Sequence, residues 1–330
     1  MSPILHDPAP RAARLALALE AGLPLPDGAI AIYRPRAGED FSLLDPTRVV
    51  MIQGFRLDHD ALSALRWQVG QAPVPAPTAL ICLPRAKAEG LALIAEAVAQ
   101  GARLVLVDGQ KTDGVEAVLK AVRARVDVAE PVSKAHGKLF WFAPGDADFR
   151  DWAAQETTVT DPDLGLFRTL PGVFSADGVD PGSALLARSL PESLPERMGD
   201  LGAGWGYLSA ACLARKGVAE IHLIEAEAQA LDLARGNVTD ARAQFHWADA
   251  TTCTLPVSLG GIVMNPPFHT GRSPQPALGL AFIVNAARML GVRGTLWMVA
   301  NRHLPYAEAL AQHFARVDVL VESPAFRVWQ

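Results

Sequence analysis

Strand-like and helix-like patterns alternate along residues 197–330, and this alternation constrains the fold of the 330-residue chain more than any other feature. The last two apolar runs, 316–323 and 325–330, are too close together for a helical crossover. A mostly parallel, doubly wound sheet that ends in an antiparallel hairpin is therefore expected. The other expected strands lie at 197–204, 220–227, 243–250, 260–268 and 294–304, and the helices at 207–217, 228–238, 277–291 and 306–315.

Residues 28–109 repeat a similar order of elements, which indicates an internal duplication. Strands are expected there at 28–35, 47–55, 78–84 and 102–109, and helices at 59–69 and 90–101. The two halves match in element type and order, not in residue identity. The stretch 145–165 between them is polar and rich in turn residues. Because domain boundaries fall in such stretches, we expect two domains, 1–152 and 153–330.

Composition places the chain among soluble globular proteins. Half of its residues are hydrophobic and a fifth are charged, and no apolar run is long enough to span a bilayer. Charged residues interrupt the N-terminal stretch 1–22, which indicates an amphipathic helix rather than a signal peptide. The three cysteines, Cys82, Cys212 and Cys253, have no metal-ligand spacing and are odd in number. We therefore expect a cytoplasmic protein with no membrane contact, disulfide framework or bound metal.

Charge is unevenly distributed. Residues 1–150 hold 17 Lys+Arg and 17 Asp+Glu, so the totals of 30 and 35 leave 13 and 18 for residues 151–330, which carry the whole net charge of −5. This balance argues against tight binding of naked nucleic acid. One stretch of the first half nevertheless gathers basic residues, namely Lys111, Lys120, Arg123, Arg125, Lys134 and Lys138. It is either a solvated helix face or a patch that contacts phosphates.

The strongest local motif, "DLGAGWG", runs from Asp200 to Gly206 between an expected strand and helix. Its glycines allow a tight turn and a close approach of a ligand to the backbone, and the free N–H groups of the following helix favour an electron-rich partner. A dinucleotide-binding fingerprint would need glycine at Tyr207. The acid followed by G-x-G-x-G instead resembles motif I of class I S-adenosylmethionine-dependent methyltransferases. A purely structural glycine turn is the alternative.

Two acids follow the next two expected strands. Glu225 ends the strand "IHLIE", where a carboxylate can accept both ribose hydroxyls of a nucleoside. It could equally be an acid that favours the start of the next helix. Asp249 ends the strand that contains "WADA". In methyltransferases of this class such an acid accepts from the adenine amino group, whereas the alternative is an exposed turn aspartate.

The stretch "MNPPFHTG" ends the fourth strand of the second half, where an open α/β sheet places its ligands. Methyl transfer to an exocyclic amine needs two acceptors that rotate the nitrogen lone pair out of conjugation. The side-chain oxygen of Asn265 and the carbonyl of Pro266 can supply them, with Pro266 and Pro267 fixing the geometry. Phe268 can stack on a flat substrate. A proline turn with a buried phenylalanine is the alternative.

This motif set resembles the amino-group methyltransferases that carry N-P-P-[FYW]. Together the stretches below resemble the bacterial ribosomal RNA small-subunit methyltransferase C family, guanine-N2 enzymes of 16S rRNA, and its large-subunit relative of the G type. The resemblance covers nearly the whole chain. It is carried by "LPGVFSADGVDPGSALL" (170–186), "MNPPFHTGR" (264–272), "VANRHLPYAEAL" (299–310), "VDGQKTDGVEAVLKAV" (107–122) and "VSKAHGKLFWF" (132–142).

The resemblance implies two tandem Rossmann-like class I methyltransferase domains, of which the first is degenerate. The first-half stretch "AIYRPRAG" lacks the glycine run, Gln53 stands where an acid is expected, and Leu83–Arg85 replaces N-P-P. Such a domain could position RNA or only support the second domain. Paired domains in one chain favour a monomer.

The resemblance also implies roles for individual residues. Asn265, Pro266, Pro267 and Phe268 would hold the target amine, and Phe174–Ser183 would form a flap over the cofactor. His269 and Asn301 would line the substrate site, or else stabilise a turn and pack the core, as His303 also could; Arg272 could meet a phosphate. S-adenosylmethionine would be bound by Asp200, Gly202, Ala203, Gly204, Gly206, Glu225, Asp249, Ala250 and Asn265. Ala203 departs from the cysteine that is common in the family.

Three functions remain open from the sequence. The first is an rRNA guanine-N2 methyltransferase, most simply of 16S rRNA within the small ribosomal subunit. The second moves the same chemistry to 23S rRNA, or to a protein glutamine or small-molecule amine. The third is a non-catalytic RNA-binding or assembly factor, which the intact "DLGAGWG" and "NPPF" motifs oppose.

Overall fold

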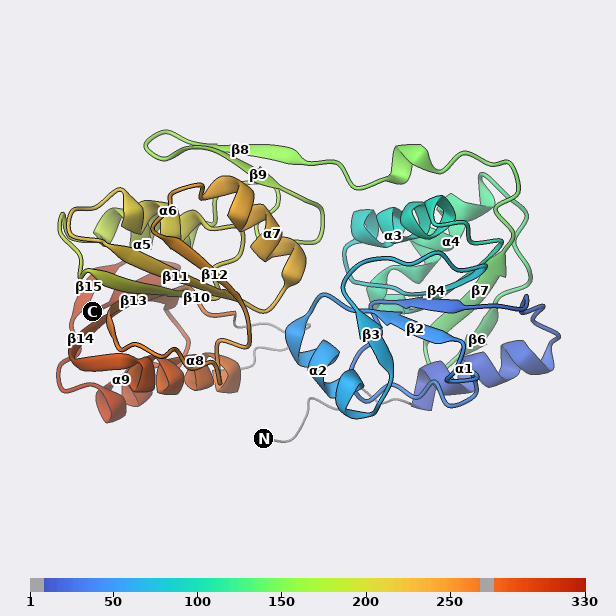
Figure 1. Cartoon of the computed structure of the whole chain (residues 1–330), viewed down its shortest axis with the longest axis horizontal. Coiled ribbons are helices and arrows are strands. Elements are labelled where there is room, and N and C mark those ends of the chain that lie inside the picture. Colours follow the sequence, from blue (N-terminus) through green and yellow to red (C-terminus); the bar gives the residue numbers. More distant parts are fainter. Residues whose placement is uncertain (1–8, 268–275) are drawn as a thin grey trace. The chain divides into compact units, whose positions relative to one another are not determined.

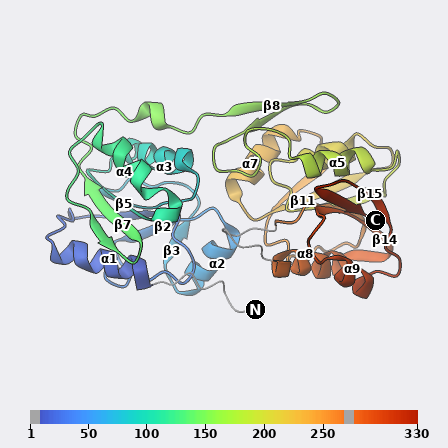
Figure 2. The same ribbon diagram turned by 180° about the vertical axis from the view of Figure 1, so that it is seen from behind.

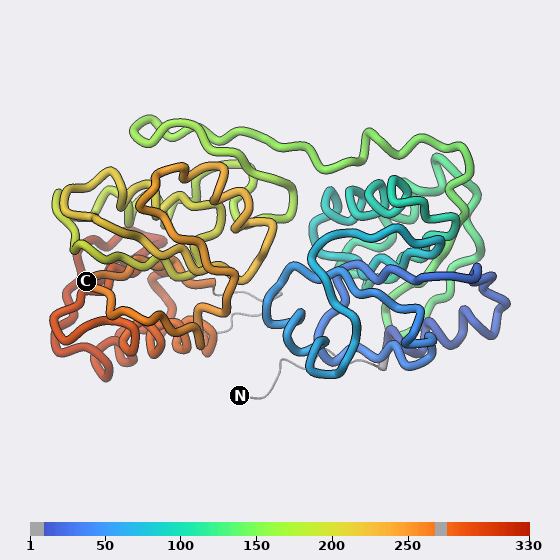
Figure 3. The backbone as a smooth tube through the Cα atoms, viewed as in Figure 1, coloured from blue at the N-terminus to red at the C-terminus, as the bar shows by residue number. Residues whose placement is uncertain are grey.

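The computed structural model describes residues 9–267 and 276–330, and the chain forms two compact units, Met1–Gln155 and Glu156–Gln330. Figure 3 follows the backbone from the blue and green unit 1 into the yellow and red unit 2. The division lies three residues after the boundary expected from the polar stretch. Within the described residues, no helix is both long and apolar enough to cross a membrane.

Unit 1 is built on a sheet that has seven strands in the described residues (Figure 1). The five strands from β3 to β5 in the sheet order pair in parallel, whereas β7 and β6 are antiparallel to their neighbours. The order across the sheet is β3 (Gln68–Gly70), β2 (Val49–Ile52), β1 (Ile30–Tyr33), β4 (Thr78–Cys82), β5 (Leu104–Gln110), β7 (Gly137–Phe142) and β6 (Val132–Lys134).

Helices cover both faces of this sheet because successive strand residues point to opposite sides. Ile30 and Ile32 of β1 share one core with α1 (Ala9–Glu20) and α2 (Arg56–Ala64). Ala31 and Tyr33 of the same strand share the other core with α3 (Lys87–Ala99) and α4 (Val115–Arg123). Strands buried on both faces read as continuous apolar runs, which is the pattern that predicted them.

Unit 2 repeats the sheet order of unit 1 strand by strand. Among its described residues, β10, β11, β12, β13 and β14 pair in parallel and the final hairpin is antiparallel, as expected from its short connection. The order is β12 (Ala243–Trp247), β11 (Glu220–Glu225), β10 (Arg197–Leu201), β13 (Leu259–Met264), β14 (Leu290–Asn301), β16 (Phe326–Trp329) and β15 (Val319–Glu322).

Two groups of helices enclose the sheet of unit 2, as Figure 2 shows from behind. On one face the core contains residues of α5 (Pro181–Ser189), α6 (Tyr207–Leu213) and α7 (Ala228–Asn237). On the other face it contains residues of α8 (Pro276–Met289) and α9 (Ala307–His313). Two tandem doubly wound α/β units therefore confirm the predicted fold class. Their identical strand order is what an internal duplication predicts.

Two elements differ from the sequence prediction. The helix expected at 59–69 ends at Ala64, because Arg66 adopts a left-handed conformation with φ 66° and the following residues pair with β2 as β3. The boundary stretch, expected to be irregular, contains the 3-10 turn Arg150–Trp152 and part of an antiparallel hairpin of β8 (Thr157–Asp161) and β9 (Gly165–Thr169). Only Val159 and Phe167 of this hairpin join the core, so its sequence is too polar to predict strands.

A buried ion network replaces part of the apolar core in unit 1. Asp108 near the end of β5 is fully buried and accepts from Arg14 Nε at 2.6 Å and Nη2 at 2.8 Å. Arg11 Nη1 lies 2.6 Å from the same carboxylate, and Arg11 Nε also donates to Glu39 at 3.0 Å. Both arginines come from α1. Buried charges are tolerated only when they are paired and hydrogen-bonded in this way.

Replacing Asp108 with alanine should lower the free energy of unfolding by about 3–5 kcal/mol, because two arginines would remain buried without their partner. Urea unfolding followed by circular dichroism measures this change. The matched control is Asp148→Ala, which removes an exposed pair with Arg150 and should leave unfolding nearly unchanged. Equal effects of the two substitutions would contradict the assignment of Asp108 as the centre of a buried network.

Candidate active site of unit 2

The glycine loop follows β10 at the carboxyl edge of the sheet. Gly202, Gly204 and Gly206 have φ values of 76°, 54° and 95°, a left-handed backbone that other residues rarely adopt. A Cβ at Gly206 would lie 2.8 Å from Val238 Cγ2, so α7 packs directly on this glycine. A Cβ at Gly204 would meet nothing within 4 Å. The loop is therefore closed on one side and open at Gly204, where a ligand can approach the backbone.

Asp200 lies beneath the loop and is fully buried. Its Oδ2 accepts from the hydroxyl of Ser209 on α6 at 2.7 Å, whereas Oδ1 has no hydrogen-bond partner among the described residues. Burial raises the pKa of Asp200 to about 7, an effect that the Ser209 hydroxyl opposes and the nearby Glu225 adds to. This carboxylate is therefore costly for the fold, and such groups concentrate at functional sites.

Glu225 ends β11 and orients its carboxylate with two backbone groups. Its Oε2 accepts from the N–H of Gly204 and its Oε1 from the N–H of Glu227, both at 2.8 Å. Burial raises the pKa of Glu225, although these two N–H groups oppose the shift. A carboxylate offers about four acceptor positions, so about two remain. They can accept a pair of hydroxyl groups.

Asp249 follows β12 and closes a turn through its side chain. Its Oδ1 accepts from the N–H of Thr251 at 2.8 Å and from the Thr251 hydroxyl at 2.7 Å, and the Thr252 hydroxyl lies 3.2 Å from Oδ2. Ala250 beside it is buried. Asp249 is thus a turn-closing aspartate at the carboxyl edge, and its position also leaves it close to the end of β11.

Asn265 follows β13, and two residues of α5 hold its side-chain amide. Nδ2 donates to Asp180 Oδ2 at 2.8 Å and to Ser183 Oγ at 2.9 Å. A carboxylate only accepts, so these contacts require the nitrogen on this side and turn Oδ1 to the other. Asp180 is itself held as the N-cap of α5, because its Oδ2 accepts from the N–H of Ser183 at 2.7 Å.

Two prolines stiffen the chain next to this amide. Pro266 is buried and Pro267 is exposed. A residue that precedes proline is confined to extended conformations, so both Asn265 and Pro266 are restricted in this way. The chain therefore leaves β13 with a stiff backbone and a side-chain oxygen whose direction is set by α5.

The segment before α5 is attached to the glycine loop by Trp205. The indole Nε1 donates to the carbonyl of Phe174 at 2.9 Å. Trp205 also packs against Phe167 of β9 and Tyr207 of α6, with ring centroids 5.1 and 5.7 Å away. The segment Phe174–Ser183 thus runs from Trp205 to the residues that hold Asn265, a course that fits a cover over the loop.

The remaining predicted residues have a mixed position. Phe268, His269 and Arg272 lie outside the described residues. Asn301 ends β14 where this strand pairs with β16, three residues beyond the level at which β14 pairs with the last residue of β13. His303 is exposed in the following turn. No hydrogen bond in the described part of the chain joins Asn301 to the other site residues.

Sequence reasoning missed the role of Asp180 and Ser183. The order Asp180-Pro181-Gly182-Ser183 is a recognisable helix start, with an aspartate N-cap and proline at the first helical position. The capping signal was therefore available, but the second contact of Asp180, to a residue 85 positions away, depends on how α5 packs.

The donors and acceptors at this edge fit a nucleoside attached to a charged group. Glu225 offers acceptors for hydroxyls, Gly204 allows close approach, and Asp200 provides a buried carboxylate with one orphaned oxygen. Among the described residues no three His, Cys, Asp or Glu side chains gather to hold a metal.

Comparison with known proteins gives a consistent family. Residues 165–330 match the family model described as the methyltransferase small domain. A ribosomal RNA small subunit methyltransferase C from Hahella chejuensis is 30% identical over 291 residues, covering 82% of this chain and 85% of its own length. The protein of the same name from Aeromonas hydrophila is 30% identical over 274 residues, covering 79% of this chain and 78% of its own.

A solved structure matches both units together. It is the T. thermophilus 16S rRNA N2 G1207 methyltransferase in complex with AdoMet and guanosine, with a TM-score of 0.79 and 24% identity. The match covers 92% of this chain and 88% of that one. At this identity the likeness concerns the fold, and it extends over the two-unit architecture.

Asp200→Asn should stabilise the protein in a pH-dependent way. The pKa of Asp200 is about 7 in the folded chain and near 3.8 when unfolded, so the folded chain binds this proton more tightly. The wild type therefore loses stability as pH rises from about 4 to about 7, whereas the variant does not titrate there. Urea unfolding at several pH values should show a difference that grows to at most roughly 4 kcal/mol. A difference independent of pH would contradict the burial of an ionisable group here.

Proposed function

The chain belongs to the ribosomal RNA small subunit methyltransferase C family, and from this membership we propose that it methylates the exocyclic N2 amine of a guanosine in 16S rRNA. The methyl donor is S-adenosylmethionine. We further propose that the substrate is the small ribosomal subunit, assembled or assembling, and that the protein acts as a monomer in the cytoplasm. A subunit offers protein as well as RNA surface, which an acidic enzyme with net charge −5 tolerates better than naked RNA.

The observation that carries this proposal is the fixed amide of Asn265. With Nδ2 bound to Asp180 and Ser183, its oxygen is available as a hydrogen-bond acceptor at the end of β13. An exocyclic amine presents two N–H donors. The Asn265 oxygen and the Pro266 carbonyl are a matched pair of acceptors on a stiff backbone.

These residues act by holding the amine. Two acceptors that each take one N–H rotate the nitrogen lone pair out of conjugation with the base. Bound S-adenosylmethionine supplies a methyl group on a positively charged sulfur, so a new N–C bond forms as the C–S bond breaks. The amine then carries a positive charge and loses its proton to water without a strong base. Positioning and preorganised dipoles therefore account for most of the rate.

The cofactor roles follow from the same edge of the sheet. We propose that the remaining acceptor positions of Glu225 take the ribose hydroxyls and that Asp249 contacts the adenine amino group while closing its turn. Gly202–Gly206 would hold the amino acid part of the cofactor, with Asp200 beneath it and Ala250 against the adenine. Phe268, His269, Arg272 and Asn301 are proposed to face the guanosine and its phosphates.

The direct test is transfer of a tritiated methyl group from S-adenosylmethionine to purified 30S and 50S subunits from a strain that lacks this protein. We expect N2-methylguanosine in digested 16S rRNA, and a loss of about 100- to 1,000-fold in kcat for Asn265→Ala, as for the removal of one preorganised group in other enzymes. Label in 23S rRNA would keep the chemistry and change the substrate. Label in neither, despite bound cofactor, would indicate a protein or small-molecule amine.

Asp180→Ala should reveal a positioning role. Without the carboxylate the Asn265 amide loses one of its two acceptors and can rotate, so kcat should fall roughly 10- to 100-fold. The KM for 30S subunits and the affinity for S-adenosylmethionine should change little. Asp180→Asn keeps an oxygen acceptor and should restore most of kcat, which a merely structural defect of the α5 N-terminus would not predict if both variants fold equally well.

A further inference from the structure

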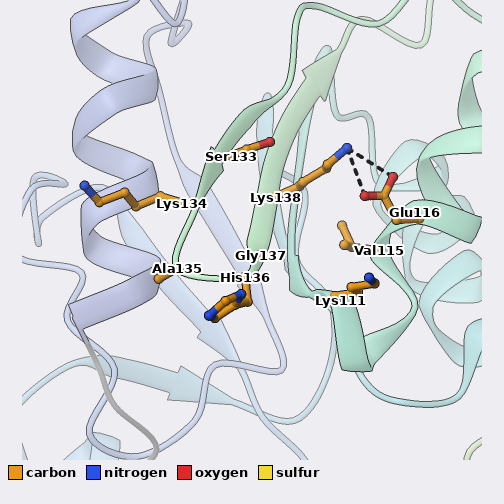
Figure 4. Close-up of a pocket in the computed structure, with 9 residues that line it drawn as sticks. All are labelled: Lys111, Val115, Glu116, Ser133, Lys134, Ala135, His136, Gly137 and Lys138. Carbon is orange, nitrogen blue, oxygen red and sulfur yellow. Dashed lines mark hydrogen bonds and ion pairs between the residues drawn. The ribbon is translucent and has the colours of Figure 1, made fainter.

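A basic hollow lies at the carboxyl edge of the sheet in unit 1, outside the proposed active site (Figure 4). It measures about 330 Å³ and lies beside the tip of the β6–β7 hairpin, next to the turn that follows β5. Four side chains around it can carry positive charge and one is acidic. Those five are Lys111, Lys134, His136, Lys138 and Glu116.

The cations of the hollow exceed its anions. Lys138 Nζ lies 2.9 Å from Glu116, which neutralises one of the three lysines. Lys111 and Lys134 are exposed and form no ion pair with any carboxylate among the described residues. The nearby Asp113 carboxylate instead accepts from the backbone N–H of Gln110 at 2.9 Å. Three lysines and one glutamate leave a charge of about +2 before His136 is counted, within a half of the chain that is neutral as a whole.

The cations lie on both sides of a narrow ridge. In Figure 4 the Lys111 and Lys138 side chains lie on one side of the hairpin, Lys134 extends on the other, and His136 lies at the tip. A single small anion could not contact both sides at once. Successive phosphates of a polymer that crosses the hairpin could, because a nucleic acid backbone carries a charge at every nucleotide.

The backbone of the hairpin is held firmly. Ala135 and His136 have φ values of 49° and 58°, left-handed conformations that cost free energy in residues other than glycine. Arg14 Nη1 donates to the carbonyl of Lys134 at 3.0 Å, and the N–H of Lys111 donates to the carbonyl of His136 at 2.9 Å. A Cβ at Gly137 would lie 2.5 Å from Arg14 Nη1, so the arginine reaches the hairpin only past a glycine.

We propose that this hollow and the adjoining hairpin tip bind the phosphate backbone of the RNA substrate. The proposal rests on the proposed function, because the rRNA supplies the phosphates. Lysines are point charges on flexible stems and contact phosphates without reading sequence. Unit 1 would thus contribute affinity and orientation, whereas the chemistry belongs to unit 2.

The test is a pair of double variants of the full chain. Lys111→Ala/Lys134→Ala removes the two lysines without ion pairs, and Arg103→Ala/Lys120→Ala removes the same charge elsewhere. Arg103 precedes β5 at the opposite edge of the sheet and Lys120 lies toward the far end of α4, both exposed. Binding of a 16S rRNA transcript is measured by fluorescence anisotropy between 50 and 200 mM salt.

The hollow variant should bind about tenfold more weakly at 50 mM salt, since each phosphate contact is worth roughly threefold over this salt range. Its slope of log affinity against log salt should be smaller by about 1 to 2. The control should change both quantities much less, because distant exposed charges are screened. Circular dichroism and thermal midpoints of both variants should match the wild type.

Methyl transfer separates this proposal from the proposed function. If the wild type methylates 30S subunits and the hollow variant raises KM for them without changing kcat, both stand. If methylation occurs but the two double variants have equal RNA affinity and salt slopes, the hollow is not an RNA site and the function is unaffected. If rRNA is not methylated at all while the hollow variant alone loses RNA affinity, the function fails and the phosphate site stands. A wild type that binds no RNA overturns the site.

Discussion

The parallel pairing of β10 with β11 and β13 is the constraint on which the proposed active site depends. Leu201 at the end of β10 pairs with Ile224 on one side and with Met264 on the other. The next residue of each strand therefore begins at the same level, which brings the glycine loop, Glu225 and Asn265 together from distant parts of the chain. The 2.8 Å bond between the Gly204 N–H and Glu225 depends on this register. A shift of one residue would turn every side chain of a strand to the opposite face.

What the sequence could predict is what depends on period and local turn chemistry. The doubly wound sheets, the terminal hairpin and the position of the glycine loop all follow from apolar runs and glycines. The course of β8 and β9 does not, because only Val159 and Phe167 are buried there. Nor does the contact of Asp180 with Asn265, because it arises from the packing of α5 against β14 rather than from any spacing. Long-range polar contacts leave little trace in a single sequence.

The duplicated fold allows the two units to be compared at one hydrogen bond. Gln53 follows β2 as Glu225 follows β11, and its Oε1 accepts from the N–H two residues ahead, at Phe55, as Glu225 accepts from Glu227. The second contact is reversed. Gln53 Nε2 donates to the carbonyl of Pro35 at 2.6 Å, whereas Glu225 accepts from a glycine N–H. Proline has no N–H to donate, so an amide fits in unit 1 where a carboxylate fits in unit 2. The acceptors that a nucleoside needs are thereby lost from unit 1.

The same comparison explains how unit 1 could lose a cofactor site and remain a stable fold. No helix follows β1 among its described residues where α6 follows β10, and α1 places Arg11 and Arg14 on Asp108 inside the unit. Buried charges of this kind are stable only as a complete network, so the arrangement excludes a ligand and fixes its surroundings at once. Arg14 also binds the carbonyl of Lys134 and thereby holds the β6–β7 hairpin. Filling the former pocket and fixing a lysine-bearing surface are therefore two results of one side chain, which is why a unit without catalytic residues can still be kept for binding.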